Sequence, residues 1–423
     1  MNTGLHLPVD QSAGPSPGAV AAGVPAWEPA GGPVAAGPPL PEIRPILLRQ
    51  PGRIAFGSGS SLELGAELSA RGLRRILVVL DPGAREACLP VVARWRDAGM
   101  EAVLYEGIDR EPTVGMFEAC LQRARAVAPD GVVGLGGGSA MDVAKLAAAL
   151  WDSGQSVAEV FGINALGSRK TFLACVPTTA GTGSEVSPNA ILLDEGSRLK
   201  QGVISPHLVP DVACVDPRLT VSAPPATTAA TGLDALTHCI EAYANRFAHP
   251  MVDLYALEGI RLISSGLPAA LANGRDERAR TCLALGSLYG GLCLGPVNTG
   301  AVHALAYPLA SRFGVAHGVS NALLLAPVLR FNLPWAVERY AAVARALGVP
   351  PGGAPEAMAE KGFRRLEELL SQCPLPRRLS ALGVPRTALP ELAAAAVTVT
   401  RLLKNNPRPV SEPDALEIYH AAW

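Results

Sequence analysis

Residues 131–150 read GVVGLGGGSAMDVAKLAAAL, and this stretch decides the fold class. A short apolar run ends in a glycine-rich turn, and a strong helix-forming segment follows at once. The turn consists of Gly136, Gly137, Gly138 and Ser139. Such a turn lets a backbone approach a phosphate, and the first turn of the helix offers unpaired N–H groups. The competing interpretation is that the glycines only turn the chain, because Ser139 stands where the usual dinucleotide fingerprint has its last glycine.

The segments before this stretch repeat the alternation of strand and helix. RILVVLD (75–81) and GMEAVLYEGI (99–108) have strand composition, and ACLPVVARWRDA (87–98) between them is helical. This order predicts parallel βαβ units and a doubly wound sheet. Asp81 ends a strand, where a carboxylate would bind a ribose hydroxyl and repel a 2′-phosphate, which favours NAD over NADP. The alternative is a turn-forming Asp before Pro82-Gly83.

A second polar loop lies in CVPTTAGTGSEVSPNAILLD (175–194), between two apolar strands. Its hydroxyls and glycines suit a phosphate or a nicotinamide amide, and they suit an ordinary turn equally well. The hydroxyls assigned to the cofactor site belong to Thr178, Thr179, Thr182 and Ser184. We also assign Asp142 and Lys200 to that site.

The chain changes character after Asp216. Apolar residues then recur at helical spacing, as in 226–247 and 251–271, with few strand signals. Because 423 residues are more than a single hydrophobic core usually accommodates, we expect two domains. We place an α/β nucleotide-binding domain at 42–216 and an all-α domain at 217–423. Residues 1–41 are rich in Pro, Ala and Gly with almost no charge, which predicts a disordered tail.

Two motifs in the helical half have the composition of a metal site. Asp234 and His238 are four residues apart in TGLDALTHCIEAY, so on a helix both emerge from one face. His303 and His317 follow in GAVHALAYPLASRFGVAHGVSNA. One carboxylate and three imidazoles complete the shell of Zn²⁺ or Fe²⁺, and they also suit Mn²⁺ or Co²⁺. A lone histidine is usually a core residue, but three of the chain's seven fall in these motifs.

Composition excludes several classes of partner. A formal net charge of −1 removes the electrostatic basis for binding nucleic acid or an anionic membrane. No uncharged apolar run reaches the length of a membrane span. The eight cysteines are scattered without a CxxC pair, which is typical of a reduced, cytoplasmic protein. With 49% hydrophobic and 17% charged residues, we expect part of the apolar surface to be buried between subunits.

Seven segments together resemble the iron-containing (group III) alcohol dehydrogenase family. They are FGSGS (56–60), EPT (111–113), GGGSAMDVAK (136–145), PTTAGTGSEVS (177–187), DALTHCIEAY (234–243), VHALAYPLASRFGVAHGVSNA (302–322) and NPRP (406–409). The resemblance implies a Rossmann-like N-terminal domain and an all-α C-terminal domain, the architecture shared with dehydroquinate synthase. It also implies NAD(P)-dependent interconversion of small alcohols and aldehydes or ketones at a divalent metal, in a homodimer or larger homo-oligomer.

The resemblance assigns roles residue by residue. The implied metal ligands are Asp234, His238, His303 and His317. The turn 136–139 would carry the pyrophosphate, and Asp81 would lie at the adenosine ribose. Thr178, Thr179 and Ser184 would line the nucleotide cleft.

One position departs from the family. A histidine commonly follows the third ligand by four residues and is thought to aid proton transfer near the nicotinamide, but this chain has Tyr307. Two interpretations stay open: the phenol donates the proton, or Tyr307 only shapes the pocket and water delivers the proton.

Other functions fit the sequence less well. In a dehydroquinate-synthase-like cyclase the first metal ligand would resemble a Glu, whereas this chain has Asp234 there. A non-catalytic relative would lack a metal ligand or have a broken phosphate loop. Maleylacetate reductases lack the full metal shell. An anionic aldehyde, such as a semialdehyde or phosphonoacetaldehyde, becomes the substrate if Arg246 or Arg312 faces the pocket, although such side chains are usually solvated.

Overall fold

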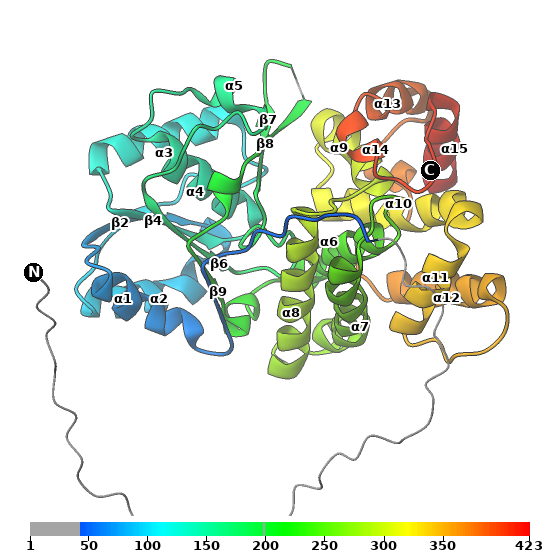
Figure 1. Ribbon diagram of the computed structural model, residues 1–423, viewed down its shortest axis with the longest axis horizontal. Coiled ribbons are helices and arrows are strands. Elements are labelled where there is room, and N and C mark those ends of the chain that lie inside the picture. The colour runs from blue at the N-terminus through cyan, green and yellow to red at the C-terminus, as the bar shows by residue number, and fades with distance from the viewer. Residues whose placement is uncertain (1–42, 198) are drawn as a thin grey trace, which may run out of the picture. The chain divides into compact units, whose positions relative to one another are not determined.

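The computed structural model describes residues 43–197 and 199–423. The predicted tail, 1–41, lies outside the described residues. Within them, an N-terminal α/β domain built on a parallel sheet is followed by a helical C-terminal domain (Figure 1).

The central sheet has six strands in the order β1-β9-β6-β4-β2-β3, and every neighbouring pair is parallel. The strands predicted at 75–81 and 99–108 are confirmed, and the apolar run before the glycine-rich turn is also a strand of this sheet. The six are β1 (Arg53–Phe56), β2 (Arg75–Leu80), β3 (Glu101–Tyr105), β4 (Gly131–Gly136), β6 (Phe172–Pro177) and β9 (Val212–Val215). Parallel pairing brings the carboxyl ends of all six strands to one edge, and the glycine-rich turn after β4 lies there.

Helices cover both faces of this sheet, and the central strand β2 is apolar on both sides because each side packs against a different pair of helices. Ile76 and Val78 belong to the core that contains α1 (Ser60–Ala70) and α2 (Arg85–Asp97). Leu77 and Val79, which alternate with them, pack with α3 and α4 on the opposite face. Those two helices are α3 (Val114–Val127) and α4 (Gly138–Leu150).

A smaller sheet extends the α/β domain toward the helices. It consists of β5 (Gly162–Ile163), β8 (Leu199–Ile204) and β7 (Asn189–Asp194), with β7 and β8 antiparallel. The short helix α5 (Val157–Val160) precedes β5. The sequence predicted β7 as the strand after the polar loop, but it gave no signal for β8, whose residues are mostly half-exposed.

The helical domain is organised around α6, which packs against α7, α8 and α10. One large core connects its helices. They are α6 (Pro225–Tyr243), α7 (Pro250–Ala272), α8 (Glu277–Leu294), α9 (Ala301–Phe313), α10 (His317–Asn332), α11 (Val337–Ala346), α12 (Pro355–Ser371), α13 (Leu389–Ala396), α14 (Thr400–Leu403) and α15 (Glu412–Ala422). In the described part of the chain, no helix is both long enough and apolar enough to cross a membrane.

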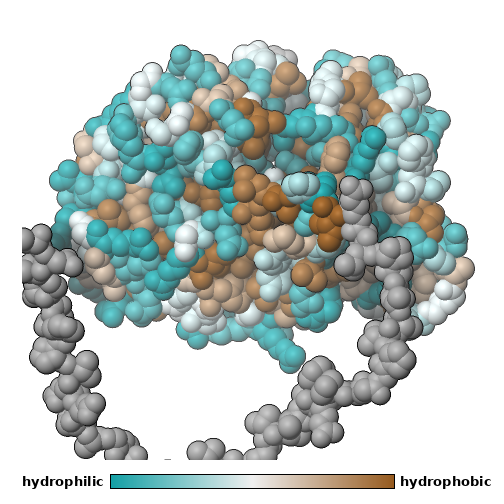
Figure 2. Space-filling model, in the orientation of Figure 1, coloured by the Kyte–Doolittle hydropathy of each residue, from teal (hydrophilic) through white to brown (hydrophobic). Residues whose placement is uncertain are grey.

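The surface carries apolar areas among hydrophilic ones, several of them near the centre of the face in Figure 2. Large apolar side chains with high exposure include Leu47, at 67%, and Leu254, at 74%. All eight cysteines are free, as the sequence predicted.

Two glycines let the polar loop touch the helical domain. Gly183 in the loop has φ +60°, and a Cβ built on it would lie 2.3 Å from the Cα of Gly291 in α8. A Cβ on Gly291 would lie 2.6 Å from the carbonyl oxygen of Gly183. Neither position accepts a side chain, so the loop and α8 pack backbone to backbone beside the candidate site.

Candidate metal and nucleotide site

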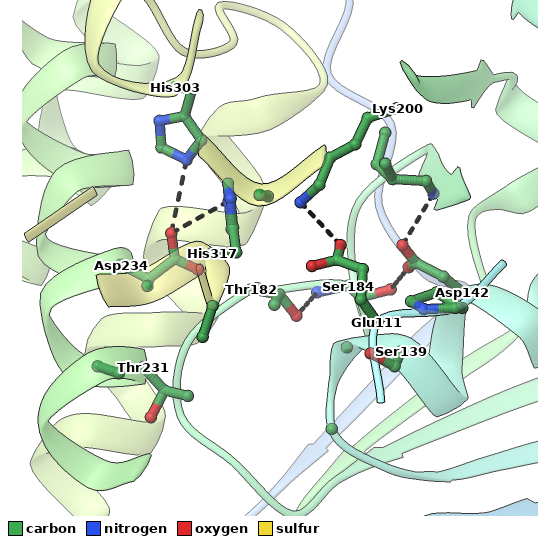
Figure 3. A pocket seen from close by; sticks show the side chains of 18 of the residues that line it. Glu111, Ser139, Asp142, Thr182, Ser184, Lys200, Thr231, Asp234, His303 and His317 are labelled. Atoms are coloured by element: carbon green, nitrogen blue, oxygen red, sulfur yellow. Dashed lines mark hydrogen bonds and ion pairs between the residues drawn. The ribbon is translucent and has the colours of Figure 1, made fainter. Parts of the chain in front are cut away.

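A cavity of about 850 Å³ lies between the α/β and helical domains. Figure 3 shows Ser139 and Asp142 of α4 on one side of it and Asp234, His303 and His317 of the helices on the other, with Thr182 between them. Residues predicted for a nucleotide and for a metal therefore face one space.

The glycine-rich turn presents the start of α4 to the cavity. Gly137, Gly138 and Ser139 line the wall, and α4 begins without a side-chain cap. A Cβ on Gly138 would lie 2.5 Å from the side chain of Thr182, so glycine is required for this turn to meet the polar loop. A helix start with uncapped N–H groups is suited to an anion such as a phosphate.

Asp81 lies at the end of β2 but does not line the cavity. Its carboxylate accepts the N–H of Gly83 at 2.8 Å and the N–H of Gly137 at 3.3 Å. Asp81 thus caps the turn, as one of the two interpretations expected. It also joins the ends of β2 and β4, and its contact with a ribose stays a prediction.

The polar loop is held to α4 through Asp142. Ser184 Oγ donates to Asp142 at 2.5 Å, and the N–H of Ile191 donates to the other oxygen at 2.9 Å. Burial raises the pKa of Asp142. Of the predicted loop hydroxyls, those that line the cavity are Thr179, Thr182 and Ser184. Asp142 lines it as well, but its carboxylate is used to position the loop.

Thr178 and Gly136 lie behind this wall. The N–H of Thr178 donates to the carbonyl of Gly136 at 2.9 Å, which extends the pairing of β6 and β4. Neither residue lines the cavity. Thr178 Oγ1 is buried and has no hydrogen-bond partner among residues 43–197 and 199–423.

Lys145, which the sequence did not predict for the site, also holds the polar loop to α4. It is fully buried on α4, and its Nζ donates to the carbonyls of Ser187 at 3.0 Å and Asn189 at 2.9 Å. Glu185 is buried nearby, and burial raises the pKa of its carboxyl to about 7. A lysine inside an otherwise apolar helix was the available signal.

Lys200 lines the cavity from β8 and has an acidic partner. Its Nζ lies 2.7 Å from Glu111, which belongs to the EPT segment. The same Nζ is 5.5 Å from the centroid of the Tyr307 ring. The side chain of Lys200 therefore extends from the small sheet toward α9.

The four predicted metal ligands come together at one carboxylate oxygen. Asp234 Oδ1 lies 3.7 Å from His238 Nε2, 3.5 Å from His303 Nε2 and 3.5 Å from His317 Nε2. Asp234, His238 and His303 are buried, and His317 is partly exposed toward the cavity. Ligand atoms of a tetrahedral site are about 3.4 Å apart when the bonds are about 2.1 Å long. The ligand atoms of Asp234, His238 and His303 all lie within 4.8 Å of one another, so these three fit a divalent cation, and His317 approaches them through Asp234 Oδ1.

The protonation of the cluster follows from its burial and its hydrogen bonds. Burial lowers the pKa of His238 to about 4 and that of His317 well below its usual range. Burial acts the same way on His303, but hydrogen bonds to Asp234 and Glu241 outweigh it and raise its pKa to about 10. The histidines in turn overcome the burial of Asp234 and hold its pKa far below the ordinary value.

Two residues outside the predicted set orient the ligands. Glu241 Oε2 contacts His303 Nδ1 at 2.6 Å, while Oε1 accepts the N–H of Val302 at 2.6 Å. Asn321 Nδ2 donates to Asp234 Oδ1 at 2.6 Å. Glu241 follows His238 by three residues, so helical spacing could have placed it beside the cluster.

Tyr307 forms part of the wall next to the cluster. It lines the cavity from α9, and its ring centroid lies 6.2 Å from that of His317. The arginines considered for the pocket lie elsewhere: Arg246 is exposed and Arg312 pairs with Glu391. Arg401 lines the cavity instead, with Nη2 3.5 Å from the Tyr307 hydroxyl.

Known proteins resemble the chain over nearly all of its described length. Residues 51–217 match the family model described as iron-containing alcohol dehydrogenase, and residues 228–423 match the C-terminal model of that family. A long-chain-alcohol dehydrogenase of Geobacillus thermodenitrificans is 40% identical, over 87% of this chain and 94% of that protein. The crystal structure of a 1,3-propanediol oxidoreductase superposes with a TM-score of 0.87 at 32% identity, covering 90% of this chain and all of the other. A sulfoacetaldehyde reductase from Bifidobacterium kashiwanohense, solved with NAD⁺, gives 0.78 at 29% identity, covering 89% and 98%.

Proposed function

The chain belongs to the iron-containing alcohol dehydrogenase family and is an oxidoreductase, and from this premise we propose what its cavity binds and converts. The proposed reaction is the NAD(P)-linked interconversion of a small alcohol and its aldehyde at a divalent metal. The observation that carries the proposal is the shared cavity, in which the uncapped start of α4 faces the cluster at Asp234.

We propose that Asp234, His238, His303 and His317 hold Fe²⁺ or Zn²⁺. The three Nε2 atoms converge on one oxygen of Asp234, while Glu241 holds the opposite nitrogen of His303. A cation bound there would polarise a carbonyl oxygen and stabilise the negative charge that develops on it during hydride transfer. Asn321 would keep the Asp234 carboxylate oriented.

For the cofactor we propose NAD, with its pyrophosphate at residues 137–139 and the reacting ring directed toward α9. The turn, Thr182 and Ser184 would bind phosphate and amide groups, and Lys145 and Asp142 would keep the loop in place. Asp81 supports NAD over NADP, because a carboxylate beside the turn repels a 2′-phosphate.

In the reduction, the reduced nicotinamide supplies a hydride, with two electrons, to the carbonyl carbon. The oxygen takes up one proton, so aldehyde, NADH and H⁺ give alcohol and NAD⁺. Tyr307 places a phenol in the cavity wall, and its ring lies 6.2 Å from that of His317. We propose Tyr307 or a water molecule beside it as the proton donor.

The test measures NADH and NADPH oxidation with short aldehydes. Anaerobically purified protein is compared after removal of metal and after reloading with Fe²⁺ or Zn²⁺. We expect turnover that depends on the metal and is faster with NADH. Activity that survives complete removal of metal contradicts the metal role, and faster turnover with NADPH contradicts the role of Asp81.

We further propose a cytoplasmic homodimer or larger homo-oligomer. Unpaired cysteines support the compartment, and exposed apolar side chains such as Leu47 and Leu254 support association. Sedimentation at several protein concentrations measures the oligomeric state, and a monomer at all of them contradicts the proposal.

A further inference from the structure

Among residues 43–197 and 199–423, Arg401 is the cationic side chain of the cavity wall that has no acidic partner. Lys200, also in the wall, pairs with Glu111 at 2.7 Å, and Arg110 pairs with Asp109 at 3.0 Å. Within the described residues, the guanidinium of Arg401 forms no ion pair, and its one side-chain hydrogen bond is the 3.5 Å contact with Tyr307. Its charge is therefore available to a ligand in the cavity.

The acidic groups of the cavity are already engaged and do not neutralise this charge. Glu111 contacts Lys200, Asp142 accepts from Ser184 and Ile191, and Asp234 belongs to the histidine cluster. A guanidinium presents planar, paired donors that match a carboxylate, sulfonate or phosphate.

The position of Arg401 is on the metal side of the cavity. It belongs to α14, which packs against α9, the helix that carries His303 and Tyr307. The Tyr307 ring contacts both groups: its centroid is 6.2 Å from that of the His317 ring, and its phenol oxygen is 3.5 Å from Arg401 Nη2. The glycine-rich turn that would bind the cofactor's phosphates is on α4, in the other domain.

Part of the cavity wall is apolar. Leu294, Val315 and Leu375 line the same cavity as the cluster and the guanidinium. A ligand that reaches from the cluster to Arg401 would therefore place a short hydrocarbon chain along this wall.

We propose that Arg401 forms an anion subsite, and that the preferred substrate is a short aldehyde or alcohol with a negative group at its far end. This inference rests on the proposed function. It names the class of substrate and makes Arg401 a specificity-determining residue, because its guanidinium would bind the anion while the carbonyl lies at the cluster.

The test compares charge at constant chain length. ω-Oxo carboxylates of three to five carbons, such as 4-oxobutanoate, are paired with the uncharged alkanals of equal length, such as butanal. We expect the wild-type enzyme to favour the anion in kcat/KM, and Arg401→Gln to lower the anion-to-neutral ratio about 10- to 100-fold. Arg401→Lys keeps the charge without the paired donors and should retain part of the preference. Arg246→Gln removes an exposed arginine outside the cavity and should leave the ratio unchanged.

A measurement on the wild-type chain keeps the inference testable if Arg401 variants do not fold. Added salt should lower kcat/KM for 4-oxobutanoate and leave that for butanal nearly constant, because salt screens the charge pair. An equal response of both substrates to salt contradicts the subsite.

The remaining outcomes separate this inference from the proposed function. If butanal is reduced but the ratio is the same in wild type and Arg401→Gln, the subsite is wrong and the dehydrogenase stands. If Arg401→Gln weakens NADH binding, measured by fluorescence without substrate, and the ratio stays constant, the guanidinium serves the cofactor's phosphates and the substrate inference is overturned. If the metal-loaded wild type reduces none of the aldehydes, the proposed function falls and the inference with it.

Discussion

Replacing Glu241 with Gln should weaken metal binding about 10- to 100-fold. In the native chain, Oε1 of Glu241 accepts the N–H of Val302 and Oε2 contacts His303 Nδ1, both at 2.6 Å. A carboxylate accepts on both sides, so it keeps a proton on Nδ1 and leaves Nε2 free to bind a cation.

Glutamine cannot reproduce both contacts. Because the N–H of Val302 can only donate, the carboxamide oxygen must face Val302, and the NH₂ group must then face Nδ1. That arrangement favours the neutral tautomer of His303 with its proton on Nε2, the atom directed at Asp234. Residues that hydrogen-bond to metal-binding histidines typically contribute 10- to 100-fold in affinity, which is about 1.4–2.7 kcal/mol.

The assay is competition for Zn²⁺ between the protein and a chromogenic chelator, at fixed pH. Glu258→Gln is the matched control, because that carboxylate is exposed on α7 and pairs with Arg261. Circular dichroism of both metal-free variants checks that they are folded. If folded Glu241→Gln binds Zn²⁺ as tightly as wild type, the tautomer argument is wrong.

Four further predictions follow from the same geometry. Asp234→Ala should abolish both metal content, measured by atomic absorption, and turnover; activity retained at wild-type level would overturn the metal mechanism. Tyr307→Phe should lower kcat about 10²-fold if the phenol donates the proton, and an unchanged kcat eliminates that role. Metal affinity should rise about tenfold per pH unit between about pH 6 and 9, because a cation must displace the proton of His303, whose pKa is raised to about 10. The same protonated imidazole stabilises the metal-free fold at pH values below the pKa of His303 in the unfolded chain. This contribution to stability is lost as the pH rises through about 10. A flat titration of affinity against pH contradicts the assignment. Gly183→Ala should cost about 2–4 kcal/mol of unfolding free energy in a denaturant titration, because its Cβ would lie 2.3 Å from Gly291; a smaller loss would mean that α8 can move away.

The sequence predicted the parts of the site that have a local signature. The spacing of Asp234 and His238 on one helix and the glycine turn before α4 are local patterns, and the structure brings both to one cavity. Glu241 could have been predicted as a partner of the cluster, because it lies on the same helix as His238. The pairing of β8 with β7 could not have been predicted, because the half-exposed residues of β8 show no clear alternation of apolar and polar side chains.

Contacts between residues far apart in the chain could not be predicted from the local sequence around either residue. Arg401 is 94 residues from Tyr307 in sequence, and nothing in its local pattern distinguishes it from the exposed Arg246 and the paired Arg312. Lys145 was visible only as a lysine in an apolar helix, without its carbonyl partners across the loop.

The contact of Gly183 with Gly291 limits how this chain can be recombined with its relatives. The α/β and helical domains are consecutive in sequence, so a crossover near residue 216 looks like a natural place to exchange one half for another. Each glycine, however, belongs to a different half, and a Cβ on either one would overlap the backbone of the other. A chimaera would inherit a usable cavity only from parents that both keep glycine here, which makes this pair a compatibility check to apply before any shuffled library is built.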